Sequence, residues 1–223
     1  MPEISFNHFY SLKHDERRTF IVGGYHKGLQ DEILGWVSKI HPIYAMILCL
    51  ASQPLERDAL IDRICYFLDM PIQLANSIID MFLLSSEPFT TILDGHVSAF
   101  PTRLLVLEFE NHCTPVDYSV KDFSYKFVDA KTERCLKSPL GLVYMVNNTC
   151  CTRCCYCYAD CDTKCKNMSL QTIDRILSDA RNLKIGNVAL SGGDFFTRND
   201  WVDVPAILNL HGYTPRLIST KKP

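Results

Sequence analysis

The chain has 223 residues, 47% of them hydrophobic and 22% charged, which is the composition of a globular protein and excludes a disordered chain. The formal net charge of -2 at pH 7 gives no overall attraction to nucleic acid. The amino terminus lacks the basic stretch and apolar run of a secretory signal, and the longest apolar run, Pro42–Ala51, is far shorter than the roughly 20 residues that cross a bilayer, so we expect a cytoplasmic protein without a membrane partner.

Apolar patterning in residues 1–100 predicts a winged-helix-like α+β domain. Two short strands and three helices are expected, at Ile4–Leu12, Arg18–Tyr25, Pro42–Ala51, Leu55–Leu68 and Ile72–Leu84. The continuous apolarity of Pro42–Ala51 indicates a buried helix. Asp94-Gly95 lies between two β-prone runs and predicts a hairpin after the third helix. Three helices followed by a hairpin are the order of a winged helix.

The charge of this domain decides which partner it suits. From Pro42 to Phe100 there are seven acidic and two basic residues, a balance of -5, which opposes binding to phosphates. We therefore expect no nucleic-acid partner. About residues 5–100, with a His41-Pro42 helix start, resemble the small winged-helix domains that bind leader peptides in peptide-modifying enzymes. The resemblance implies a peptide-recognition domain that captures its peptide by strand addition. A structural amino-terminal cap is the alternative.

Residues 101–138 are expected to form a linker or peripheral segment, with a strand at Leu104–Phe109. Residues 139–223 have a different pattern, in which strands and helices alternate. Three strands are expected at Gly141–Val146, Asn187–Leu190 and Arg216–Ser219, with a helix capped by Ser169 and ending near Gly186 and a second helix at Asp200–Leu208. The first strand is continuously apolar, as in a strand buried on both faces. This βαβαβ order predicts a parallel sheet.

A dense run of cysteines follows the first of these strands. Six of the 15 residues from Asn147 to Cys161 are cysteine, in a chain with 11 cysteines in all. In a reducing cytosol such thiols bind metal or perform chemistry. Cys150, Cys154 and Cys157 have the spacing C-x3-C-x2-C. Three thiolates on one loop can hold three irons of a [4Fe–4S] cluster, which takes four ligands, and leave the fourth iron open.

Two other uses of the thiols stay open. One is a zinc site, in which a C-x2-C pair, either Cys151 with Cys154 or Cys154 with Cys157, binds the metal. Cys161 and Cys165 would supply the second pair of ligands. A thioredoxin-like redox pair is the other, although that motif opens a helix in a different context. The roles of Cys151, Cys155, Cys161 and Cys165 are not assigned by the spacing.

These residues resemble the radical S-adenosylmethionine (radical SAM) enzymes. The hallmark of that family is C-x3-C-φ-C with an aromatic φ, here Tyr156, after the first strand of a (β/α) barrel. The second strand ends in Ser191-Gly192-Gly193-Asp194, which matches the family's Gly-Gly-Glu motif with Asp in place of Glu. The resemblance implies that Cys150, Cys154 and Cys157 hold the cluster. It also implies that S-adenosylmethionine meets Tyr156, the residues Ser191, Gly192, Gly193 and Asp194, and Ser219 in the polar tripeptide after the third strand.

The resemblance further implies an activity. A [4Fe–4S] cluster would cleave S-adenosylmethionine reductively to a 5′-deoxyadenosyl radical, with an external one-electron donor, for modification of a peptide substrate. No catalytic residue beyond the cluster ligands is predicted. The likeness covers about residues 140–223, only the first three strands of a barrel. We therefore expect a truncated or split enzyme, whose barrel a second chain or a missing carboxyl-terminal part completes. The alternative is a non-catalytic, cysteine-rich adaptor that binds zinc or an iron–sulfur cluster beside a winged helix.

Overall fold

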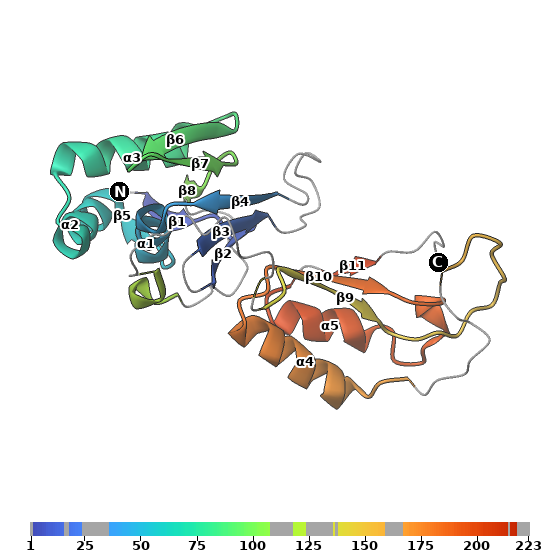
Figure 1. Ribbon diagram of the computed structural model, residues 1–223. Helices are drawn as coiled ribbons and strands as arrows, with labels where there is room; N and C mark the ends of the chain where they lie inside the picture. The colour runs from blue at the N-terminus through green and yellow to red at the C-terminus, as the bar shows by residue number, and fades with distance from the viewer. Residues whose placement is uncertain are drawn as a thin grey trace. The chain divides into compact units, whose positions relative to one another are not determined.

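The computed structural model describes residues 2–15, 18–23, 36–107, 118–123, 136, 138–158, 167–213 and 215–217. The chain is a mixed α/β protein that divides into two compact units, Met1–Lys137 and Ser138–Pro223 (Figure 1). Each unit has a hydrophobic core of its own. No helix in the described ranges is long and apolar enough to cross a membrane.

The first unit contains three small antiparallel sheets. One has the order β5-β1-β8, from Leu55–Glu56, Glu3–Phe6 and Leu105–Leu107. The second has the order β2-β3-β4, from Tyr10–Asp15, Arg18–Gly23 and Val37–Ile40. The third is the hairpin of β6 (Phe89–Leu93) and β7 (His96–Phe100). Its turn has positive φ at both Asp94 (50°) and Gly95 (77°), as a two-residue type I′ turn requires, so the predicted hairpin is confirmed.

The first unit also contains three helices: α1 (Pro42–Leu50), α2 (Arg57–Leu68) and α3 (Ile72–Leu84). All three predicted helices are confirmed. Seven of the nine residues of α1 are buried, as its continuous apolarity predicted. By contrast, α2 and α3 each bury one stripe of apolar side chains, which includes Ile64 in α2 and Phe82 in α3.

The prediction of one strand over Ile4–Leu12 is wrong. The chain turns at Asn7, whose Oδ1 accepts a hydrogen bond from the Phe9 N–H (3.1 Å) while its carbonyl accepts one from the Tyr10 N–H (3.0 Å). As a result β1 and β2 belong to different sheets. Lys13–Asp15, which separate the two predicted strands in the sequence, lie in β2. An asparagine that bonds its own backbone two residues on is turn chemistry that the apolar pattern does not show.

The segment expected to be a linker contributes to the core of the first unit. Its described part, residues 118–123, contains the short 3₁₀-helix η2 (Val120–Phe123), and both Tyr118 and Phe123 are buried. The Tyr118 hydroxyl accepts a hydrogen bond from the Leu12 N–H at 3.0 Å, and the Cys49 thiol donates to the Tyr118 carbonyl at 3.2 Å. Of the expected strand Leu104–Phe109, β8 covers Leu105–Leu107, and the strand's last two residues lie outside the described ranges.

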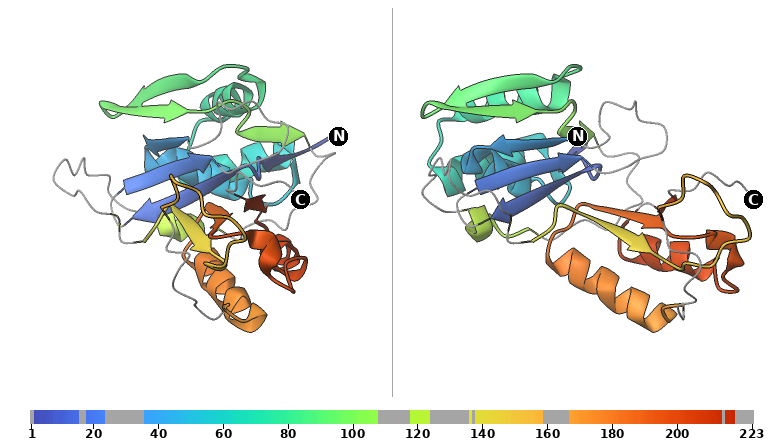
Figure 2. Two further views of the ribbon diagram at one scale, coloured as in Figure 1. Left: turned by 90° about the vertical axis from the view of Figure 1, so that its right-hand side faces the viewer. Right: turned by 45° about the vertical axis from the view of Figure 1, so that its right-hand side comes forward.

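The second unit is built on three parallel strands. These are β9 (Gly141–Met145), β10 (Asn187–Ser191) and β11 (Arg216–Leu217), in the order β11-β10-β9. Along the chain, helix α4 (Leu170–Asn182) connects β9 to β10, and α5 (Asp203–Leu210) connects β10 to β11. Figure 2 shows both helices on the same face of the sheet. The predicted parallel βαβαβ order is confirmed.

The prediction that the first of these strands is buried on both faces is wrong. Tyr144 is buried and Leu142 packs against the core under α4 and α5, but Val143 is 61% and Met145 44% exposed. Here, a continuous apolar run belongs to a strand with one face covered by helices and one face exposed. The Ser169 cap is confirmed, since its Oγ accepts from the Thr172 N–H at 3.2 Å. The helix that it begins ends earlier than predicted, at Asn182 rather than near Gly186.

Candidate functional site

The cysteine loop and the Gly-Gly-Asp turn lie side by side at the carboxyl ends of β9 and β10. The strands pair in register up to Met145 and Ser191. Backbone hydrogen bonds then continue past both strand ends: the Gly193 N–H donates to the Asn147 carbonyl (3.0 Å) and the Asp194 N–H to the Thr149 carbonyl (2.7 Å). Two motifs that are 40 residues apart in the sequence are therefore adjacent in space, as parallel strands place the loops that follow them.

Backbone proximity explains why the turn contains two glycines. A Cβ on Gly193 would lie 2.2 Å from the Thr149 carbonyl oxygen, and one on Gly192 would lie 2.3 Å from that of Asn147. Gly192 also has a φ of 133°, which side chains rarely adopt. The sequence suggested that these glycines admit a ligand. In the structure the group that approaches them is the backbone of the cysteine loop itself.

Asp194 brings a carboxyl group to this junction, and the residue is only 9% exposed. One carboxylate oxygen, Oδ1, accepts from the Phe196 N–H at 3.2 Å and so caps the 3₁₀-helix η3 (Phe195–Thr197). The other, Oδ2, accepts from the Cys151 thiol at 3.2 Å. The carboxylate therefore faces the cysteine loop directly. Ser191, the last residue of β10, is also buried, and its hydroxyl is hydrogen-bonded to that of Tyr158.

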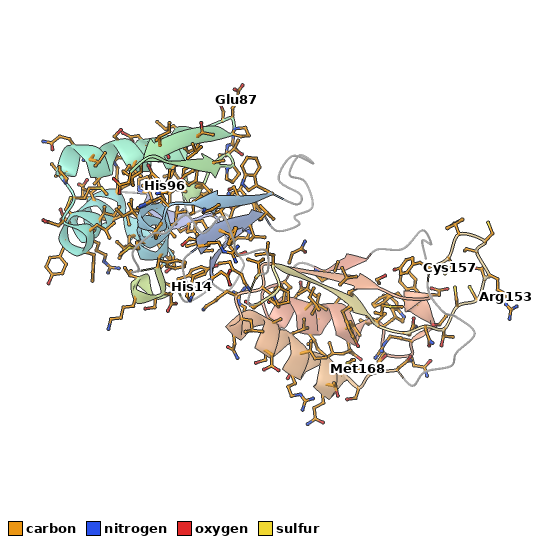
Figure 3. All side chains as sticks on the ribbon, viewed as in Figure 1. His14, Glu87, His96, Arg153, Cys157 and Met168 are labelled. Carbon is orange, nitrogen blue, oxygen red and sulfur yellow. The ribbon has the colours of Figure 1, made fainter. Side chains whose placement is uncertain are left out.

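The three predicted ligand cysteines differ in exposure. Cys150 and Cys154 are partly buried and Cys157 is exposed. The thiols of Cys150 and Cys154 lie 3.8 Å and 3.7 Å from the same oxygen, the Thr152 hydroxyl, so they are close to each other. The Cys157 N–H donates to the Cys154 carbonyl at 3.0 Å, which closes a turn between these two cysteines. Figure 3 shows Cys157 and Arg153 well away from Met168, which lies just before α4.

The donor chemistry of the loop suits an iron–sulfur cluster, since such clusters are held by cysteine thiolates. In the described residues, however, these thiols are not arranged as a complete metal site. Within the described residues, no group of three or more His, Cys, Asp or Glu side chains is placed so that it could hold a metal ion. Tyr156 is 72% exposed. Ser219, Cys161 and Cys165 lie outside the described residues.

An ion pair between a buried arginine and a half-buried aspartate was not predicted from the sequence. Arg198 is 1% exposed and is held by Asp200. A cation and an acid two residues apart, shortly after the Gly-Gly-Asp turn, hint at an ion pair in the sequence but do not show that the arginine is buried. The phenol of Tyr144 is buried near the pair: burial raises its pKa, Arg198 partly offsets this rise, and Asp200 adds to it. The Tyr144 hydroxyl and Asn147 Oδ1 are buried without a hydrogen-bond partner among the described residues.

No protein-family model and no curated protein matches the sequence. Among solved structures, the fold is similar to that of SuiB from Streptococcus suis. The crystal structure of SuiB bound to the precursor peptide SuiA matches with a TM-score of 0.59 and 12% identity, over 98% of this chain and 44% of SuiB. SuiB bound to S-adenosylmethionine matches with a TM-score of 0.56 and 11% identity, over 96% of this chain and 42% of SuiB. The chain thus spans less than half the length of the SuiB chains, and at this identity the likeness establishes a shared fold.

Proposed function

We propose that this chain is a radical SAM enzyme, or a part of one, that acts on a peptide. One observation carries the proposal: the loop with the C-x3-C-φ-C spacing is hydrogen-bonded to the Gly-Gly-Asp turn at the carboxyl ends of two parallel strands. A zinc knuckle or a redox pair does not need that turn. The structural likeness to a protein crystallised with S-adenosylmethionine supports the same cofactor here.

Each residue of the site has a distinct task in this proposal. Cys150, Cys154 and Cys157 would hold three irons of a [4Fe–4S] cluster, and the cluster would supply the electron that cleaves S-adenosylmethionine. Asp194 would accept a hydrogen bond from the ammonium group of the methionine moiety, because a carboxylate suits that cation. Its Oδ2 is the oxygen that the Cys151 thiol contacts, so the ammonium group would take the place of this thiol. Tyr156 would contact the adenine, and Ser219 would add a further polar contact.

A peptide substrate is supported by the first unit. Its three helices are followed by a hairpin, the order found in winged-helix domains, and the balance of -5 from Pro42 to Phe100 disfavours nucleic acid. The similar SuiB structure contains a precursor peptide. We also propose an external one-electron donor, a cytoplasmic setting, and further βα units from another part of the protein or a second chain.

The test is anaerobic reconstitution with iron and sulfide, followed by electron paramagnetic resonance of the reduced protein with and without S-adenosylmethionine. We expect a [4Fe–4S] signal that changes shape when S-adenosylmethionine is added. The variants Cys150→Ala, Cys154→Ala and Cys157→Ala should each lose it. Cys155→Ala is the matched control, because it removes an exposed thiol of the same loop, and it should keep the signal.

Two results contradict the proposal. Stoichiometric zinc in a colourless protein would favour the adaptor, in which cysteine pairs bind zinc without catalysis. A cluster that survives all three triad substitutions would show that other thiols hold it.

A further inference from the structure

Arg198 is the largest fully buried side chain in the described residues, and nothing in the proposed function uses it. A buried guanidinium is costly unless its charge is paired and its N–H groups are bonded. Asp200 pairs with it in a two-point fork, Nε to Oδ1 and Nη2 to Oδ2, both at 2.9 Å. The remaining contacts are to two backbone carbonyls. Nη1 donates to Val146 at 2.8 Å and Nη2 donates to Met168 at 3.0 Å.

These two carbonyls lie at the two ends of the cysteine loop. Val146 directly follows β9, and Met168 directly precedes Ser169, the cap of α4. Between them are residues 147–167, which contain seven of the 11 cysteines, including all three predicted ligands. A single guanidinium therefore fastens the point where the loop leaves the sheet to the point where it enters the helix.

A second set of contacts ties the backbone of Arg198 and the first residue of the loop to the Gly-Gly-Asp turn. Arg198 directly follows η3, which Asp194 caps, and its own N–H donates to the Phe195 carbonyl at 3.3 Å. Asn147, the first residue of the loop, donates from Nδ2 to the Asp194 carbonyl and to the Thr197 hydroxyl, both at 3.0 Å. The loop ends and the turn are thus one connected network, with the arginine at its centre.

We propose that Arg198, neutralised by Asp200, is a positioning residue that holds both ends of the cysteine loop and so lowers the cost of bringing the ligand thiols together around a metal. The part of this inference that concerns metal ligation rests on the proposed function; the fastening of the loop does not. Groups behind the ligands of a metal typically change metal affinity about 10- to 100-fold when they are replaced, because unfixed ligands must be ordered on binding.

Arg198→Lys is the informative variant. It keeps the charge and a partner for Asp200, but an ammonium group on a flexible stem cannot reproduce the planar fork and reach both carbonyls. Arg198→Met removes the charge as well at similar volume. Leu177→Ala is the matched control: Leu177 is 1% exposed in the core of the same unit, so the variant weakens that unit without touching the network.

The first measurement is amide hydrogen exchange, followed by nuclear magnetic resonance, on the full metal-free chain. In Arg198→Lys the amides of Gly193 and Asp194, which bond to the loop, should exchange about tenfold faster, while those of Val188 and Leu190 within β10 stay unchanged. In Leu177→Ala we expect the opposite distribution. Equal acceleration throughout the unit in Arg198→Lys, or none, would overturn the fastening role.

The second measurement is the affinity for Co²⁺, read from the thiolate-to-cobalt absorption band. We expect a band that Cys150→Ala and Cys154→Ala lose, and a Kd about tenfold higher in Arg198→Lys at unchanged stoichiometry. An unchanged Kd would overturn the positioning role and leave the proposed function standing. A wild-type chain without the band would instead refute the thiolate site of the proposed function, and the exchange measurement would still decide whether Arg198 fastens the loop.

Discussion

At the scale of single residues, two glycines of the second unit differ sharply in their surroundings. A Cβ on Gly193 would collide with the Thr149 carbonyl oxygen at 2.2 Å, whereas one on Gly141 would meet the Asn187 carbonyl oxygen at an ordinary 3.5 Å. We therefore predict that Gly193→Ala lowers the free energy of unfolding by about 1–3 kcal/mol, because backbone must move to admit the methyl group. Gly141→Ala should change it by less than about 0.5 kcal/mol.

Urea unfolding of both variants, read from circular dichroism, checks this prediction. Equal losses of stability would mean that the loop does not approach the turn as closely as the hydrogen bonds at Gly193 and Asp194 indicate.

The carboxylate of Asp194 gives a prediction for ligand binding at the same scale. Asp194→Asn keeps an oxygen to accept from the Phe196 N–H but removes the charge that would hold an ammonium group. If Asp194 performs this task, S-adenosylmethionine should bind the reconstituted chain about tenfold more weakly, because a hydrogen bond to a charged group contributes about 1.5–3 kcal/mol. Isothermal titration calorimetry measures the affinity. Asp203→Asn, in the first turn of α5, is the control, and an equal loss there would refute a specific role for Asp194.

Individual residue types predicted the contents of the site better than its arrangement. The spacing of Cys150, Cys154 and Cys157 and the place of Asp194 after the second strand are properties of the sequence. That the thiol nearest to Asp194 belongs to Cys151 depends on the path of a loop, which spacing does not determine. Arg198 was missed because a buried arginine is defined by the carbonyls around it, and these lie far away in the sequence.

At the scale of elements, helix α1 begins with an unusual cap. Nδ1 of His41 accepts a hydrogen bond from the Ile43 N–H at 3.3 Å, in place of the more common Ser, Thr, Asp or Asn oxygen. Burial lowers the pKa of His41 below its ordinary 6.5; nearby Asp94 opposes this shift and His96 adds to it. Because the folded state then binds the proton less readily than the unfolded state, the stability present above about pH 6.5 is lost as the pH falls through the folded-state pKa.

We predict that His41→Asn flattens this pH dependence, because the asparagine oxygen still caps the helix but does not titrate. The measurement is the urea midpoint of the first unit between about pH 7.5 and about pH 5, where histidine charges. His14→Asn, at an exposed histidine of the same unit, is the control and should keep the wild-type slope. A slope that His41→Asn leaves unchanged would show that other groups cause the acid loss.

Elements with a strong local signal were predicted well. The helix Ile72–Leu84 has the predicted bounds, and the Asp94-Gly95 hairpin follows from the positive φ that its turn demands. The errors occur where tertiary structure decides. The strand at Gly141–Met145 has an exposed face because the two described α-helices of its unit, α4 and α5, both lie on the other side of the sheet, and an apolar run is the same in either case. The turn at Asn7 depends on one side-chain hydrogen bond.

At the scale of the whole molecule, the hydrophobic residues form two separate cores. Ile64 and Phe82 belong to the core of Met1–Lys137, and Leu177 and Val204 to that of Ser138–Pro223. A core that closes within one unit stabilises that unit, so a cavity in one should leave the intrinsic stability of the other unchanged. The sequence suggested two parts, because the pattern of apolar residues differs between residues 1–100 and residues 139–223. It did not show that Tyr118 and Phe123, after the first hundred residues, complete the first core.

The two tryptophans allow this independence to be measured, because Trp36 packs against the first core and Trp201 lies in the second unit beside Phe196, with ring centroids 5.2 Å apart. Trp201→Phe and Trp36→Phe each leave one fluorescent reporter. In these backgrounds, Ile64→Ala should lower the unfolding midpoint reported by Trp36 alone, and Leu177→Ala the midpoint reported by Trp201 alone. Each substitution should cost about 2–5 kcal/mol in its own unit, since it empties a buried site. If either substitution shifts both midpoints together, the two units unfold as one cooperative body.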